Sequence, residues 1–338
     1  MNQKFIYFHV PKSAGSSLNN FLSANIDNYL KHIESEKIDS KFVFENYDAL
    51  SGHVPFSRIE KLFDLGCIST LITFREPYSY VASHIAWIRK LADEGEEERF
   101  NNHPEIFQKI ALKMKEFDFS QPREITAFIL WLEEIKFFYL HNTQTIYLDL
   151  NKNIERALEN LQKIDFVGVT DRLEEFIDIL AYEFDFEKLD IAKTNVNKNS
   201  NKYGLDVTNE ETRKALLPLL DKDIVIYEES KKTFNALQSL YVNETDLTLK
   251  GFVEETDNIC KGWARYENSH KHVELGLYVD DKLLETTMAK IYRKNLKCEG
   301  IDNTGNCEFR FKTPVDYNKN KIVVKDLLTE QELSIIQK

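Results

Sequence analysis

The segment Phe5–Leu18 constrains the fold of this 338-residue chain more than any other part of the sequence. Residues 5–9 (Phe-Ile-Tyr-Phe-His) predict a short buried strand, a turn rich in serine follows, and Leu18, Phe21 and Leu22 mark the apolar face of a helix. A strand, turn and helix in this order direct backbone N–H groups and the positive end of the helix dipole to one point. The sequence therefore predicts an anion site where this strand ends.

The turn itself carries the groups that a phosphate needs. Lys12 adds a full positive charge, and we expect hydrogen-bond donors from the five residues that follow it: Ser13, Ala14, Gly15, Ser16 and Ser17. In a Walker A loop the lysine comes after the last glycine, whereas here it comes before Gly15. The turn is therefore a different kind of phosphate loop, or else a glycine turn with an incidental lysine.

A second anion site is predicted further along the chain. Residues 68–74 form an apolar run typical of a buried parallel strand, and Arg75 lies at its end. Pro77 suits the first turn of the next helix, which places Ser83 about two turns along that helix. A guanidinium with a nearby hydroxyl binds phosphate well, although an arginine that only caps a strand–helix junction is the alternative.

These two motifs together resemble the bacterial carbohydrate sulfotransferases that use PAPS (3′-phosphoadenosine 5′-phosphosulfate). The resemblance rests on His-x-Pro-Lys-x-Ala-Gly-x-Ser at residues 9–17 and on an arginine followed eight positions later by a serine, and it covers about residues 4–235. It implies that Lys12 and residues 13–17 hold the 5′-phosphosulfate, while Arg75 and Ser83 hold the 3′-phosphate. PAPS is then the sulfuryl donor and PAP (adenosine 3′,5′-bisphosphate) the product, with no metal required.

A Gly-His pair lies between the two motifs, in Ser51–Phe56. This segment is similar to the region of the catalytic histidine in the uronyl (heparan) 2-O-sulfotransferase branch, which implies that His53 is the base that acts together with Lys12. Histidine titrates in the range that a general base needs, although a lone histidine is more often structural. We expect His9 to be an inward-facing strand residue and His84 to be a neighbour of the site.

The segment 193–203 is polar, basic and rich in asparagine. It reads as a surface loop on composition. A functional alternative is a lid over the nucleotide, with Lys198 or Lys202 reaching a phosphate.

Strand-like and helix-like runs alternate through the first two thirds of the chain. This pattern predicts an α/β fold, namely a P-loop-like parallel sheet flanked by helices on both faces, as in the sulfotransferase fold. Both phosphate motifs then lie at carboxyl ends of strands, where such sheets bind ligands. The predicted strands are residues 5–9, 42–44, 68–74, 145–148 and 166–169, and the predicted helices are 16–24, 56–64, 77–92, 104–115, 121–140, 153–164 and 172–184.

The helical period stops near Val242 and short strands follow. Asp280-Asp281 predicts a hairpin turn within these strands. We therefore expect two domains, a PAPS-dependent sulfotransferase domain at 1–240 and a small all-β sandwich at 246–338. The second loosely resembles an accessory module of bacterial surface-glycan enzymes and would bind glycan or serve as an interface. Trp263 and Tyr266 could stack on sugars, but the favoured role is that of core aromatics.

The net charge of −12 disfavours nucleic acid and a densely sulfated acceptor as partners. The four cysteines are scattered and match no zinc spacing, so we expect free thiols and no metal. No apolar run is long enough for a bilayer and no signal sequence is evident, which predicts a cytoplasmic protein. Its C-terminal domain would bring it near a membrane or a glycan-assembly site.

The sequence thus predicts an enzyme that transfers a sulfuryl group from PAPS to a hydroxyl of a glycan or glycolipid. Two alternatives stay open: a small-molecule or nucleotide kinase, and a non-catalytic glycan-binding protein with a degenerate nucleotide fold. The absence of a Walker A loop disfavours the kinase, and the intact Lys12, Arg75 and Ser83 disfavour the degenerate protein.

Overall fold

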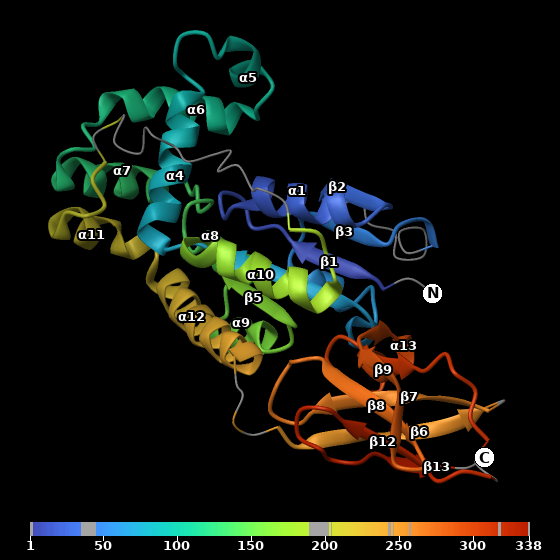
Figure 1. Ribbon diagram of the computed structural model, residues 1–338. Coiled ribbons are helices and arrows are strands. Elements are labelled where there is room, and N and C mark those ends of the chain that lie inside the picture. Colours follow the sequence, from blue (N-terminus) through green and yellow to red (C-terminus); the bar gives the residue numbers. More distant parts are fainter. Residues whose placement is uncertain are drawn as a thin grey trace.

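The computed structural model describes residues 3–34, 45–188, 203, 205–242, 245, 247–256, 258–316 and 319–336. Its N-terminal part is an α/β structure with a five-stranded parallel sheet flanked by helices, as predicted (Figure 1). The strand order is β2-β3-β1-β4-β5, so the first strand lies in the middle of the sheet. The strands are β1 (Phe5–Phe8), β2 (Tyr29–Glu34), β3 (Ala49–His53), β4 (Ser69–Phe74) and β5 (Phe166–Val169).

The helices bury two separate apolar cores. One lies around the sheet, and the other lies between α4, α6, α7 and α11 in the helical layer beside it. The described helices of this part are α1 (Gly15–Asn25), α3 (Phe56–Ile59), α4 (Pro77–Lys90), α5 (Glu97–Asn101), α6 (Glu105–Lys113), α7 (Pro122–Glu134), α8 (Thr143–Ile146), α9 (Ile154–Leu161), α10 (Leu173–Phe184), α11 (Glu210–Leu216) and α12 (Asp221–Val242). Short 3₁₀ turns lie at Leu65–Cys67, Met114–Glu116, Thr170–Arg172 and Leu217–Leu219.

One predicted strand is wrong. Residues 145–148 were expected to extend, but Thr143–Ile146 form helix α8. The cause is distant in sequence: the buried carboxylate of Asp223 accepts hydrogen bonds from the backbone N–H groups of Gln144 (3.1 Å) and Thr145 (2.8 Å). These contacts satisfy the first N–H groups of the helix, which otherwise have no partner. The other expected strand, 42–44, lies outside the described residues.

Residues 249–336 form a β module with its own core. Two sheets, ordered β10-β11-β7-β6-β13 and β12-β8-β9, share one set of buried apolar side chains. Asp280 and Asp281 turn the hairpin between β8 and β9, both with positive φ, so that prediction is confirmed. The elements are β6 (Leu249–Thr256), β7 (Ile259–Tyr266), β8 (Val273–Val279), β9 (Lys282–Ala289), β10 (Ile291–Tyr292), α13 (Lys294–Cys298), β11 (Asn306–Arg310), β12 (Ile322–Asp326) and β13 (Ser334–Ile336).

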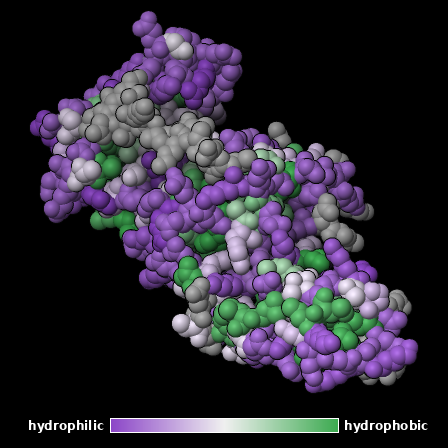
Figure 2. All heavy atoms as spheres, in the orientation of Figure 1, coloured by the Kyte–Doolittle hydropathy of each residue, from purple (hydrophilic) through white to green (hydrophobic). Residues whose placement is uncertain are grey.

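Tyr266 is buried in this core as expected, whereas Trp263 is partly exposed. Most of the surface in view is hydrophilic, and Figure 2 shows hydrophobic residues gathered on the visible face of the module. Edge strand β9 adds exposed Leu283, Leu284 and Met288. None of the described helices combines the length and the apolar character that a bilayer span needs.

The β module docks at the amino ends of the parallel strands, away from their carboxyl edge. Lys297 of the module is buried and forms an ion pair with Asp165 (3.1 Å), just before β5. A disulfide joins Cys67, just before β4, to Cys298 in α13. The prediction of free thiols is therefore wrong for this pair, because nothing local in the sequence signals a pairing across 231 positions. The prediction is right for Cys260 and Cys307, which are buried and form no disulfide.

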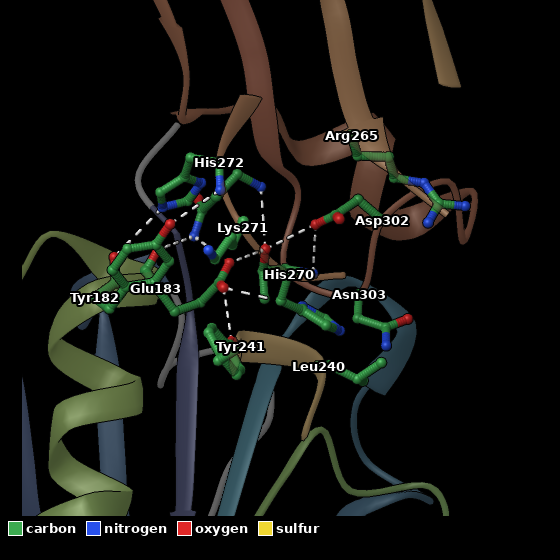
Figure 3. Close-up of polar contacts among 12 residues, drawn as sticks. Tyr182, Glu183, Leu240, Tyr241, Arg265, His270, Lys271, His272, Asp302 and Asn303 are labelled. Carbon is green, nitrogen blue, oxygen red and sulfur yellow. Dashed lines mark hydrogen bonds and ion pairs between the residues drawn. The ribbon is translucent and has the colours of Figure 1, made fainter. Parts of the chain in front are cut away.

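A buried carboxylate lies at the centre of a second part of this interface, where α10, α12 and the module meet (Figure 3). Glu183 accepts hydrogen bonds from the hydroxyls of Tyr241 (2.7 Å) and Thr304 (2.6 Å), and its backbone carbonyl accepts one from Asn306 (2.9 Å). His270 stacks on Tyr241, and its Nδ1 lies 4.0 Å from the Glu183 carboxylate. Burial raises the pKa of Glu183 to about 7.

This raised pKa predicts a pH dependence of stability. The folded protein holds the Glu183 proton more tightly than the unfolded chain does, so protonated Glu183 contributes to the free energy of unfolding. This contribution is fully present below the ordinary pKa of a glutamate and is lost as pH rises towards about 7. The unfolding free energy of wild type should therefore fall between about pH 5 and pH 8. In Glu183→Gln this fall should be smaller by on the order of 2 kcal/mol. Denaturant titrations at several pH values measure this difference.

The control is Asp185→Asn, a change in the surface carboxylate that pairs with Lys290 (3.0 Å). It should leave the pH profile close to wild type, since exposed ion pairs contribute little. Asp302 and His270 also influence this interface, so the comparison uses the difference between variant and wild type. Identical profiles for wild type and Glu183→Gln would contradict the prediction.

Candidate functional site

The loop after β1 has an unusual backbone. Lys12 and Ala14 both adopt left-handed conformations, with φ of 65° and 61°, and α1 begins immediately afterwards at Gly15. A Cβ atom on Gly15 would lie 1.7 Å from Nε2 of His9, so only glycine fits against this ring. The amino end of α1 thereby lies at the carboxyl edge of the sheet, the arrangement that favours an anion.

Ser13 has a different role from the one expected. Its hydroxyl donates to the carbonyl of Val10 (2.6 Å), and its own carbonyl accepts a hydrogen bond from the Thr73 hydroxyl (2.8 Å). The residue is fully buried. Ser13 therefore stabilises the loop against β4, while Ala14, Ser16 and Ser17 are at least partly exposed at the start of α1.

Arg75 lies directly beside this loop. Its guanidinium donates to the Lys12 carbonyl (3.3 Å). Its backbone is held on both sides by the fully buried side chain of Gln144: the Arg75 N–H donates to Oε1 (2.8 Å), and Nε2 donates to the Arg75 carbonyl (2.9 Å). Asp223 fixes Gln144 in turn through the helix contacts described above. Sequence reasoning missed Gln144 because it lies beside the segment expected to be a strand.

Lys12 lies near other cationic side chains, of which Lys90 and Arg99 are paired with Glu96. The pKa of Lys12 is lowered by burial and then by the like charges of Arg99, Arg75 and Lys90. Lys12 Nζ also lies 5.2 Å from the centre of the Trp87 ring. Burial lowers the pKa of Arg75 as well. An anion bound here would offset both the repulsion and the lost hydration.

Ser83 lies on the side of α4 that approaches the loop. It is partly exposed and precedes Trp87 by four positions, so the two residues share one helix face. Its neighbour His84 is buried and packs on Tyr80 at 4.6 Å between ring centres. The pKa of His84 falls to about 3, through burial and then the charge of Lys12, which fits the expectation that it neighbours the site.

His53 ends β3 at the same edge of the sheet. Its ring centre lies 4.9 Å from that of His9, and the His9 ring centre lies 6.1 Å from that of His32 on β2. Gly52 is required here because a Cβ would lie 1.9 Å from the carbonyl oxygen of Ile33. Burial, followed by the nearby His53 and His32, lowers the pKa of His9 to about 3, so His9 is neutral.

His9 was expected to be an inward-facing strand residue, and it does lie buried just after β1. No local pattern in the sequence indicates that its ring links Gly15 to His53. No three side chains of the His, Cys, Asp and Glu types are grouped to hold a metal ion in the part of the chain that the structure describes. Lys198 and Lys202 lie outside the described residues.

The structure thus brings Lys12, Arg75, His53 and the helix face with Ser83 to one edge of the sheet. It adds three residues that sequence reasoning did not assign to the site: His9, Trp87 and Gln144. Comparisons with known proteins add no assignment, since no protein-family model matches the chain and no curated protein is significantly similar to it.

The contact between His9 and Gly15 predicts a pair of compensating substitutions. Gly15→Ala should lower the unfolding free energy by about 1–3 kcal/mol, because the new methyl group overlaps the imidazole. His9→Ala in the same chain should restore most of this loss by removing the ring. Urea titrations of the two single variants and the double variant measure the coupling.

Gly66→Ala is the matched control, since its Cβ would meet only the flexible Asp64 carboxylate at 3.3 Å. It should unfold like wild type. If Gly15→Ala lowers the unfolding free energy by the same amount in wild type and in the His9→Ala variant, the contact between His9 and Gly15 is contradicted.

Proposed function

We propose that this chain is a PAPS-dependent sulfotransferase that transfers a sulfuryl group to a hydroxyl of a carbohydrate, either a glycan or a glycolipid. The observation that carries the proposal is the meeting of Lys12, Arg75 and the amino end of α1 at one sheet edge, next to His53. Two partly buried cations beside a helix start favour a ligand with several negative charges. PAPS has two phosphate positions and a sulfuryl group, and the resemblance assigns one motif to each end.

Each residue then has a distinct part in binding. Lys12 and the start of α1 hold the 5′-phosphosulfate, and the Lys12 charge stabilises the negative charge that grows on the leaving phosphate oxygen. Arg75, with Ser83, binds the 3′-phosphate and so distinguishes PAPS from ATP. Gln144 keeps the Arg75 backbone fixed, so the guanidinium needs little reorganisation on binding.

The transfer step is an in-line attack at sulfur. His53 removes the proton from the acceptor hydroxyl while the new S–O bond forms and the bond from sulfur to the phosphate oxygen breaks, which releases PAP. The lowered pKa of His9 makes its imidazole a weak proton acceptor, which favours the neighbouring His53 over His9 as the base. As in phosphoryl transfer, the protein contributes mainly positioning and electrostatic stabilisation.

The acidic body fits an uncharged or weakly charged acceptor better than a polyanion. A cytoplasmic location fits the donor. Because thiols are kept reduced there, the Asp165–Lys297 pair and the Glu183 contacts would then hold the β module without the Cys67–Cys298 bond.

Calorimetry with PAP tests the binding half of the proposal. Wild type should bind PAP at micromolar or better, and Arg75→Ala should lose at least tenfold, about 1.4 kcal/mol. The affinity for AMP should differ little between wild type and Arg75→Ala, because AMP lacks the 3′-phosphate. Gln144→Ala should weaken PAP binding in the same direction without removing a charge.

Arg123→Ala is the control, because this arginine is a surface residue with an 84% exposed side chain. It should bind PAP like wild type. Tight ATP binding with no PAP binding would favour a kinase and contradict the proposal.

The chemical half is tested with His53→Ala. This variant should keep its PAP affinity but transfer sulfate from PAPS to a panel of neutral oligosaccharides at least about 100-fold more slowly, the usual range for loss of a general base. The rate of PAP formation with acceptor present is the readout. Unchanged transfer would remove His53 from the mechanism, and binding of oligosaccharide without transfer by wild type would favour the non-catalytic protein.

A further inference from the structure

Two neighbouring cavities lie on the flank of the α/β part, away from the phosphate loop. The smaller, of about 190 Å³, lies between α3 and α9 and is lined by Ser57, Asn151, Arg156 and Glu159, among others. The larger, of about 540 Å³, lies at the junction with the β module, with Phe63, Asp64 and Gly66 on one side and Lys297 and Asp302 on the other. The larger volume falls within the range of natural ligand sites, which often lie between domains.

The two cavities share one wall, formed by Glu60 and Lys163. Lys163 Nζ lies 3.3 Å from the Glu60 carboxylate, 3.0 Å from the Asn160 side-chain oxygen and 5.8 Å from the centre of the Phe56 ring. The Lys163 side chain is 54% exposed, so it can rotate aside at small cost. With Lys163 turned aside, the two cavities would join into one groove, here called the flank groove.

The chemistry of the flank groove is polar and mixed. Both hydrogen-bond donors and hydrogen-bond acceptors line the groove, and the Phe63 ring offers an apolar face. Carboxylates outnumber cations, which disfavours a sulfated or phosphorylated chain. The acidic side chains are Glu60, Asp64, Asp149, Glu159, Asp165 and Asp302, and the basic ones are Lys61, Arg156, Lys163 and Lys297.

The path of the groove relates it to the candidate site. Helix α3 begins three residues after His53, and the chain then passes through residues 63–66 to the start of β4 at the opposite edge of the sheet. The groove follows this course and ends against the module. A chain bound along it would extend from Ser57 in α3 to Lys297 in α13.

We propose that the flank groove binds an extended neutral oligosaccharide. Such a chain presents hydroxyls that donate and accept hydrogen bonds along its whole length, matching the mixed lining, and has apolar ring faces that pack on an aromatic side chain. The β module would then serve substrate binding by completing the groove rather than by touching the phosphate loop. Only the assignment of this oligosaccharide as the acceptor depends on the proposed function.

Gly66→Trp tests the groove by filling its larger cavity. The Gly66 backbone does not need positive φ, and a Cβ there meets only Asp64, so the fold should tolerate the change. Calorimetry would use neutral oligosaccharides of glucose, galactose and N-acetylglucosamine, with a heparin oligosaccharide as the polyanion. At least one neutral chain should bind wild type below about 1 mM, and the variant should bind it at least tenfold more weakly.

Lys163→Ala gives a second, independent change at the shared wall and should also alter neutral-chain affinity. Lys115→Ala, an exposed lysine beside α6, is its matched control and should not. PAP affinity should stay at the wild-type value in all three variants. Loss of oligosaccharide binding with intact PAP binding supports the groove, and oligosaccharide binding without any PAP binding keeps the groove but rejects the proposed function.

Three results would overturn the inference. The first is that no neutral chain binds at about 10 mM. The second is that the heparin oligosaccharide binds more tightly than every neutral chain. The third is that neutral binding is unchanged in both Gly66→Trp and Lys163→Ala.

Discussion

The close packing of the His9 ring on Gly15 is the contact on which the candidate site depends. It joins the end of β1 to the start of α1, and the same ring lies beside His53 at the end of β3. A side chain at position 15 would move the helix start away from the sheet edge. One contact therefore sets the distance between the anion site and the histidine proposed as base.

Electrostatics add a second constraint. The chain carries a net charge of −12, yet Lys12 and Arg75 are partly buried side by side at the sheet edge. Holding two such cations together without a ligand costs stability, so the surrounding structure must fix them firmly. The contacts from Asp223 to Gln144 and from Gln144 to Arg75 do this from behind, in a part of the chain that lies far away in sequence.

Local patterns in the sequence were enough to predict strands β1, β4 and β5, the loop, the helix that carries Ser83 and the β character of the C-terminal part, but they missed strands β2 and β3. Two other failures share a cause, which is dependence on distant partners. Helix α8 forms because Asp223 satisfies its first N–H groups, and Cys67 meets Cys298 only because the module docks on the sheet. The buried hydroxyl of Ser13 shows the same limit, since residue type alone does not tell which way a side chain faces.

The most direct test of this account is a crystal structure of the protein with PAP. We expect the 5′-phosphate at the start of α1 within hydrogen-bond distance of Lys12, the 3′-phosphate against the guanidinium of Arg75, and the His53 ring facing the vacated sulfuryl position. PAP bound elsewhere on the molecule, or bound at this edge with Arg75 turned away from both phosphates, would contradict the account.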